Sequence, residues 1–323
     1  MINIKFLGMI ILLVIAFFYG VYYGIISPNG YFLGIATTVF IWSIISLSLN
    51  LQIGYTGLTN LGHAGLVGIG AYTSAILTLK LGMSFWVALP VAGLVAALFG
   101  VLIGVISLRT KEIHFAIITL MVGIMLYVTF QSWGELTGGA LGMRAPRPSD
   151  INLLTYTISF KSPATWYFLT LVIFLLVAYM CQRLVKSKIG LTFISIREDE
   201  LLSVHMGTDI RKYKILSVVI SCFLAGVAGS LLAHYLTFIN PECFKYTTSL
   251  EIIIFTCFGG VGTIVGPIFG VFSLKTISEF FQFLAYYRMI LYGIIIILVL
   301  KFMPQGVYPF LKNKIKGFVK SLG

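Results

Sequence analysis

Long apolar runs separated by short polar segments dominate this chain. Between Lys5 and Lys80 there is no Lys, Arg, Asp or Glu, and every later apolar run exceeds the ~18 residues that mark a candidate spanning helix. The later charge-free runs cover residues 81–108, 113–134, 162–182, 215–241 and 252–274. The pattern predicts an all-α, polytopic integral membrane protein with about eight to ten spanning helices, in a single transmembrane domain over residues 1–323.

The runs also predict where the helices and their connections lie. Helices are expected at residues 6–26, 31–51, 57–79, 84–107, 112–132, 165–183 and 214–236, followed by a less regular apolar region at 248–303. Because no small-residue cleavage site follows the first run, we interpret it as a spanning helix rather than a signal peptide. With the N-terminus inside, segment 133–164 is an external loop and segment 184–213 is cytoplasmic. In segment 304–323, lysines flank one apolar helical face, which predicts a helix along the inner membrane surface.

Composition and charge agree with a membrane location. Hydrophobic residues make up 59% of the chain and charged residues 10%, and the net charge is +12. The positive residues gather in short segments between apolar runs and at the C-terminus, which is typical of cytoplasmic loops that face anionic lipid. We therefore expect membrane lipid as a partner, and no nucleic acid.

Two glycine-rich segments interrupt the apolar pattern, at residues 54–70 and 258–270. Glycine lowers helix stability by ~1 kcal/mol, and unwound backbone persists in a bilayer only where protein or water satisfies it. One such segment in each half of the chain is typical of broken helices in a translocation pathway. The alternative is close helix packing, as expected for the GxxxG pair Gly100 and Gly104.

The residues predicted to belong to this pathway come from both segments. They are Asn50, Gln52, Thr56, Asn60, His63, Gly259, Gly260 and Gly262. Polar side chains inside a membrane need partners and can line a wet path. Hydrogen bonding to neighbouring helices explains the same polar residues equally well.

The sequence contains no motif for metal binding, catalysis or nucleotide binding. The four histidines, His63, His114, His205 and His234, do not form a ligand spacing, so we expect no metal site. The apolar runs contain no acid/base or nucleophile constellation, which argues against an enzyme. No G-x-x-x-x-G-K-[ST] phosphate loop is present, so any nucleotide chemistry must come from another chain, and no cofactor is expected in this one.

A charged block stands out in the stretch "ISIREDELLSVHMG", residues 194–207. Three of the ten acidic residues, Glu198, Asp199 and Glu200, follow Arg197 there. If the chain is helical from Glu198, the acids are favourably placed at a helix N-terminus, and Gly207 would end the helix. This pattern predicts a short amphipathic helix that docks a soluble partner. A solvated loop with a charge run is the alternative.

Several segments together carry a family resemblance. They are "LNLQIGYTGLTNLGHAGLVGIGAYTSAIL" (49–77), "HFAIITLMVGIMLYV" and "LTGGALGM" (within 114–143), "GLTFISIREDELLSVHMGTDIRKYKILSVVIS" (190–221), "AGVAGSLLAHYLTFINPECF" (225–244), "SLEIIIFTCFGGVGTIVGPIFG" (249–270) and "MPQGV" (303–307). They occur in family order over residues 40–307, and the chain resembles the LivM-type permeases of branched-chain amino-acid ABC importers.

The resemblance implies an ABC importer permease fold in the bacterial inner membrane and transport of branched-chain or other hydrophobic amino acids. It also implies a second related permease, two ATP-binding subunits that bind ATP and Mg, and an external substrate-binding protein, for which loop 133–164 is the expected docking site. The family's cytoplasmic loop sits in a cleft of the ATP-binding subunit. The residues that fall on its pattern here are Arg197, Glu198, Asp199, Glu200 and Gly207. The family's small alanines are replaced by "LLSV" in this chain.

Two alternatives remain open at the level of sequence. An ion-coupled secondary transporter would use Glu251, which opens an apolar run, as its titrating group, although an interfacial position explains Glu251 as well. Within the ABC class, related permeases also serve urea and short amides.

Overall fold

The computed structural model describes residues 30–107, 112–148, 151–153, 156–160 and 162–280, with short stretches between residues 290 and 314. The helix expected at 6–26, much of the last part of the apolar region 248–303, and most of segment 304–323 lie outside these residues.

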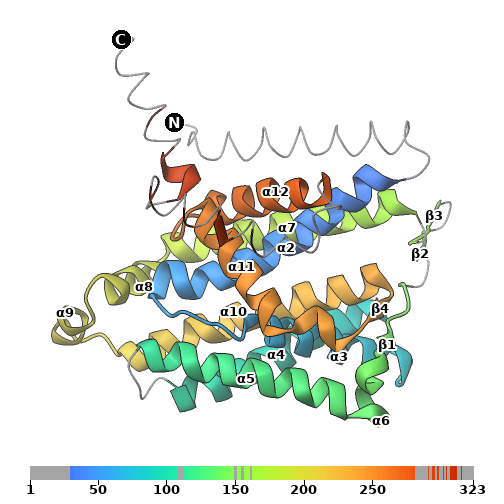
Figure 1. Ribbon diagram of the computed structural model, residues 1–323, viewed down its shortest axis with the longest axis horizontal. Helices are drawn as coiled ribbons and strands as arrows, with labels where there is room; N and C mark the ends of the chain where they lie inside the picture. The colour runs from blue at the N-terminus through green and yellow to red at the C-terminus, as the bar shows by residue number, and fades with distance from the viewer. Residues whose placement is uncertain are drawn as a thin grey trace.

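Helices make up most of the described chain (Figure 1). Five are long and apolar enough to cross a membrane: α2 (Tyr31–Asn50) with its π-helical continuation Leu51–Thr56, α4 (Phe85–Ser107), α5 (Glu112–Ser132), α7 (Pro163–Lys186) and α10 (Ile210–Leu236). Three shorter apolar helices are α3 (His63–Leu79), α11 (Tyr246–Gly259) and α12 (Val265–Phe280). The predicted all-α, polytopic membrane class is confirmed.

Shorter elements connect these helices at the two ends of the bundle. They are α6 (Gly134–Thr137), a 3-10 turn at Gly139–Leu141, β1 (Met143–Arg144), β2 (Ile151–Leu153), β3 (Tyr156–Ile158), α8 (Lys188–Glu198), α9 (Glu200–His205), β4 (Phe238–Ile239) and a 3-10 turn at Pro241–Phe244. In Figure 1, α8 and α9 lie at the left end of the bundle and all four strands at the right end. Strands β1 and β4 pair antiparallel, with Met143 opposite Ile239, so the described part of segment 133–164 that holds β1 is tied to the end of α10.

Helix α10 forms the centre of the bundle and packs against α4, α3 and α2. Small residues permit this contact: a Cβ placed on Gly70 of α3 would lie 2.2 Å from the carbonyl oxygen of Gly226 in α10. On α4, a Cβ on Gly100 would lie 2.8 Å from Sγ of Cys222. Close packing is therefore the role of these glycines, as small residues allow between membrane helices.

One expected helix boundary is wrong, and glycine explains it, as it explains the break in the region from 248 that the sequence predicts to be less regular. The helix expected at 57–79 begins only at His63, because Gly57 ends the π-helical segment in the left-handed conformation, with φ of 77°. The apolar region from 248 breaks between Gly259 and Val265, where Gly260 and Gly262 have φ of 118° and 75°. Both glycine-rich segments thus interrupt helices.

Candidate translocation and coupling site

The two helix breaks meet near the α8 end of the bundle. The carboxamide of Asn50, at the end of α2, accepts a hydrogen bond from the backbone N–H of Gly262 over 3.0 Å. The same side chain donates to the carbonyl oxygen of Thr263 over 2.8 Å. Asn50 is fully buried, so one side chain joins segments from the two halves of the chain through two backbone bonds.

Glycine is required where the breaks touch. A Cβ on Gly54 would lie 2.5 Å from the backbone nitrogen of Gly262 and 2.2 Å from Oδ1 of Asn50. The second break is closed by Thr263, whose hydroxyl donates to the carbonyl oxygen of Gly260 over 2.9 Å and accepts from the Gly266 N–H over 3.0 Å. We call Asn50, Gly54, Gly262 and Thr263 the break junction.

Two of the predicted pathway residues have partners on neighbouring helices. The hydroxyl of Thr56 lies 3.1 Å from Oγ of Ser217 in α10. Nε2 of His63 lies 2.8 Å from Oγ of Ser48 in α2. Both residues are fully buried, so the hydrogen-bonding interpretation accounts for these contacts.

Gln52 and Asn60 differ from Thr56, and Nδ1 of His63 also has no hydrogen-bond partner among the described residues. Gln52 and Asn60 are both fully buried, and among the described residues neither amide atom of Gln52 has a hydrogen-bond partner. Asn60 uses its Oδ1 to accept from the Gly62 N–H over 3.0 Å, whereas its Nδ2 has no partner within that part of the chain. Burying an amide without a partner is costly, so these two side chains keep hydrogen-bonding capacity that no described residue uses.

The glycines predicted for the pathway have structural roles. A Cβ on Gly259 would lie 1.8 Å from the carbonyl oxygen of Gly266, so this glycine permits the close approach of α11 and α12. Gly260 and Gly262 adopt positive φ, which favours glycine.

The charged block, residues 197–200, forms the bend between α8 and α9, and we call this bend together with α9 the elbow. Asp199 lies between the two helices and caps α9, because its Oδ1 accepts a hydrogen bond from the Leu202 N–H over 2.9 Å. Glu200 pairs with Lys214 of α10, and Glu198 pairs with Arg197 over 2.7 Å. The expectation of a helix from Glu198 is therefore wrong in detail: Glu198 ends α8, and Glu200 begins α9.

Gly207 ends α9 in the way that its sequence position predicts. It has φ of 80°. Its N–H donates to the carbonyl oxygen of Val204 over 2.9 Å, and the N–H of Thr208 donates to the carbonyl oxygen of Ser203 over 3.0 Å. This pair of bonds is a Schellman motif, so the boundary at Gly207 is confirmed.

The apolar residues of the elbow point outward. We call the following four residues the α9 surface, and their exposed fractions are large: Leu201 75%, Leu202 60%, Val204 53% and Met206 80%. Figure 1 shows α9 projecting beyond the ends of the long helices. Exposed apolar groups on a projecting helix are typical of a contact with another protein.

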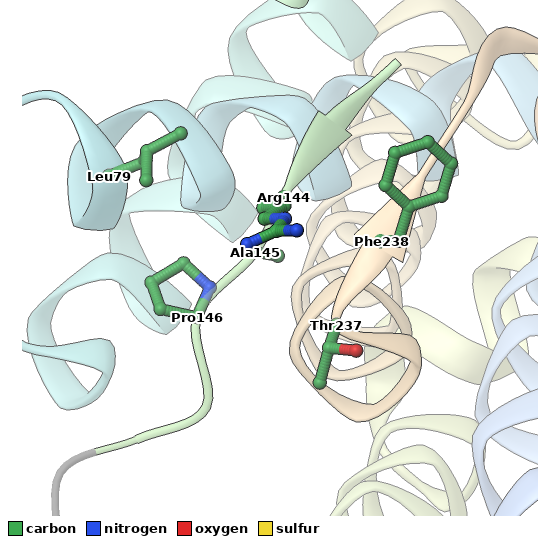
Figure 2. Close-up of a pocket in the computed structure, with 6 residues that line it drawn as sticks. All are labelled: Leu79, Arg144, Ala145, Pro146, Thr237 and Phe238. Atoms are coloured by element: carbon green, nitrogen blue, oxygen red, sulfur yellow. The ribbon is translucent and has the colours of Figure 1, made fainter. Parts of the chain in front are cut away.

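A cavity opens at the opposite end of the bundle. It has a volume of about 650 Å³ and is lined by Leu79, Arg144, Ala145, Pro146, Thr237 and Phe238. Figure 2 shows Leu79 and Pro146 on one side, Thr237 and Phe238 on the other, and Arg144 between them. The β1–β4 pair thus places a cation at a partly apolar hollow.

Hydrogen bonds fix this end to the core. The ring of His234 in α10 contacts the hydroxyl of Ser74 over 2.8 Å and the carbonyl oxygen of Pro146 over 2.6 Å. Nearby, Glu242 accepts a hydrogen bond from Tyr127 over 2.8 Å and pairs with Lys245. The hydrogen bond from Lys245 lowers the pKa of Glu242, and Glu242 raises the pKa of Lys245.

Sequence reasoning missed Ser48, Ser217 and Thr263, which complete these contacts. Isolated hydroxyl residues in apolar runs give no signal of their partners, because the partners come from distant segments. Within the described residues, no group of three or more His, Cys, Asp or Glu could hold a metal ion.

The bundle, the helix breaks and the projecting elbow define a membrane transport protein. Comparison with known proteins gives the family: the description "Branched-chain amino acid transport system / permease component" matches residues 31–300. The chain belongs to this family, and it is a permease subunit of an ABC importer.

Curated relatives agree with this membership. The chain is 31% identical over 301 residues to the high-affinity branched-chain amino acid transport system permease protein LivM of Escherichia coli, covering 87% of this chain and 71% of the relative. It is 24% identical to a probable LivM of Methanocaldococcus jannaschii, covering 83% and 90%. It is 25% identical to the nucleoside ABC transporter permease NupC of Lactococcus lactis, covering 67% and 73%. The comparison with solved structures gives no match. These relatives do not favour an ion-coupled secondary transporter.

Proposed function

We propose that this permease carries branched-chain or other hydrophobic amino acids across the bacterial inner membrane, and that ATP hydrolysis in two partner subunits supplies the energy. A second related permease completes the membrane part. The names of the LivM relatives support the substrate class.

The α9 surface is the observation that carries the coupling part of this proposal. Its exposed apolar residues project from the bundle, whereas Asp199 caps α9 and Glu200 pairs with Lys214. We infer that the apolar residues make the contact with the ATP-binding subunit and that the acids hold them in position. Segment 184–213 then passes the movement of that subunit to the membrane helices.

The pathway in this proposal runs beside the break junction. Gln52 and Asn60 support it, because their buried amide groups lack partners among the described residues. ATP and Mg are bound by the partner subunits. The external binding protein docks on segment 133–164, where the cavity beside Arg144 offers a cation and apolar groups.

Uptake of labelled leucine by cells tests the proposal. Leu201→Ser together with Leu202→Ser replaces two exposed side chains, so the chain is expected in the membrane at the normal level with uptake reduced at least several-fold. Leu191→Ser, 62% exposed on α8, is the matched control and is expected to retain uptake. Normal uptake in the double variant would contradict coupling through the α9 surface.

Competition with unlabelled solutes tests the substrate class. An excess of isoleucine or valine is expected to suppress leucine uptake, and urea or a nucleoside is not. The reverse order would contradict the proposed substrate while leaving the coupling proposal in place.

A further inference from the structure

One side chain connects the elbow directly to the break junction. Arg197 lies in the last turn of α8, and its Nη1 donates to the carbonyl oxygen of Gly54, 143 residues away in sequence, over 2.5 Å. Nη1 would also lie 2.9 Å from a Cβ on Gly262. Arg197 therefore contacts both helix breaks at the point where they meet.

The other branch of the same guanidinium faces the elbow. Nη2 of Arg197 bonds to Oε1 of Glu198 over 2.7 Å. A planar guanidinium can serve two acceptors in fixed directions, which an ammonium cannot do. Arg197 thus holds a backbone carbonyl of the bundle with one nitrogen and a carboxylate of the elbow with the other.

The chain between Arg197 and the α9 surface is short. Only Glu198 and Asp199 separate Arg197 from the first residue of α9. Helix α8 is anchored by Phe193 and Ile196, which are 0% and 1% exposed. A tilt of the elbow about this anchor would therefore also move the guanidinium.

The carbonyl oxygen of Gly54 accepts this bond close to the first helix break. Gly54 belongs to the π-helical segment Leu51–Thr56, which ends at Gly57. The helix therefore does not continue past the junction. Hydrogen bonds to charged groups are stronger than neutral ones. Loss of Arg197 would leave the two hydrogen bonds of the Asn50 side chain, accepted from Gly262 and donated to Thr263, to link the breaks.

We propose that Arg197 is a positioning residue that latches the break junction closed and releases it when the elbow moves. The inference rests on the proposed coupling through segment 184–213. It adds that the movement enters the membrane helices at the Gly54 carbonyl group and the second helix break.

Labelling of an engineered cysteine tests the latch. Val261, which lies within the second break and is half-buried, is replaced by Cys in the full transporter. Inside-out membrane vesicles are treated with a membrane-impermeant maleimide, with and without ATP, and the chain with its four natural cysteines supplies the background. In the otherwise unchanged chain, ATP is expected to speed labelling at position 261.

Arg197→Ala is expected to make labelling without ATP faster by about ten-fold or more, because a hydrogen bond to a charged group is worth roughly one decade in an equilibrium constant or more. Arg197→Lys keeps the charge but loses the two-branched geometry, so an intermediate rate is expected. Arg183→Ala is the matched control, since Arg183 bonds to Tyr179 on α7, away from the junction.

The outcomes separate the latch from the proposed function. If ATP speeds labelling in the parent but both Arg197 variants label at the parent's rate without ATP, the latch is wrong and the coupling proposal survives. If ATP has no effect in the parent, the coupling proposal itself is contradicted. Should Arg197→Ala fail to reach the membrane, Arg197→Lys alone decides, and a rate equal to the parent's overturns the latch.

Discussion

The side chain of Asn50 is bonded to the backbone of Gly262, 212 residues later in the chain, over 3.0 Å. A second bond from the same carboxamide reaches the carbonyl oxygen of Thr263. Each bond uses a different function of the amide, one as acceptor and one as donor. The end of α2 and the turn between α11 and α12 are therefore joined by a group that no other residue type of the same length reproduces.

Replacing Asn50 by Asp is expected to lower stability and uptake. The carboxylate keeps the acceptor for Gly262 but loses the donor, so the Thr263 carbonyl group is left without this partner. An unsatisfied buried group costs about 1–3 kcal/mol. The unfolding temperature of the purified protein in detergent and leucine uptake in cells measure the two effects.

Asn240→Asp is the matched control for Asn50. Oδ1 of Asn240 accepts from the backbone N–H of Cys243, and a carboxylate can do the same. This variant is expected to keep its unfolding temperature. Equal losses in both variants would show that an added charge, rather than the missing donor, causes the effect at Asn50.

The contact of α3 with α10 predicts a packing effect. In Gly70→Ala the new Cβ would lie 2.2 Å from the Gly226 carbonyl oxygen, and such overpacking costs typically about 1–3 kcal/mol. We expect a lower unfolding temperature. Gly134→Ala is the control, because nothing lies within 4 Å of a Cβ there; an unchanged Gly70→Ala protein would contradict the packing at this crossing.

The elbow predicts different effects for two changes at Asp199. Alanine removes the cap of α9, which costs about 1 kcal/mol in typical helices, whereas asparagine is an equally good cap. ATP-driven uptake is therefore expected to fall in Asp199→Ala and to persist in Asp199→Asn, with both chains at the normal membrane level. If Asn and Ala reduce uptake equally, the negative charge is what the elbow needs.

Glu251 provides the test of an ion-coupled mechanism. It is half-buried in the second turn of α11. Since the account assigns the driving force to ATP, Glu251→Gln is expected to leave both uptake and its pH dependence unchanged. Loss of uptake together with a flattened pH profile would support a titrating role for this carboxyl group.

The sequence predicts local breaks better than it predicts their contacts. Gly207, Gly260 and Gly262 adopt positive φ, and the structure places helix ends at or beside these positions. The helix from Glu198 was wrong because Asp199 acts as a cap in its own right, which splits the charged block. Capping is a local signal, and each of the adjacent acids Glu198 and Asp199 can mark a helix start.

The break junction could not be predicted from the sequence. Asn50 and Gln52 are both amides in an apolar run, yet the side chain of Asn50 has two backbone partners and the side chain of Gln52 has no hydrogen-bond partner among the described residues. The difference depends on segments more than 200 positions apart in the chain, which only the packed bundle brings together. The π-helical turn that positions Gly54 likewise has no distinctive residue pattern.

Co-purification tests the central claim most directly. The chain is tagged, its native membrane is solubilised in mild detergent, and the proteins recovered in stoichiometric amount are identified and reconstituted for uptake. The account predicts a second permease and ATP-binding subunits, with leucine uptake that requires ATP. Recovery of the chain alone, with uptake that does not depend on ATP, would contradict it.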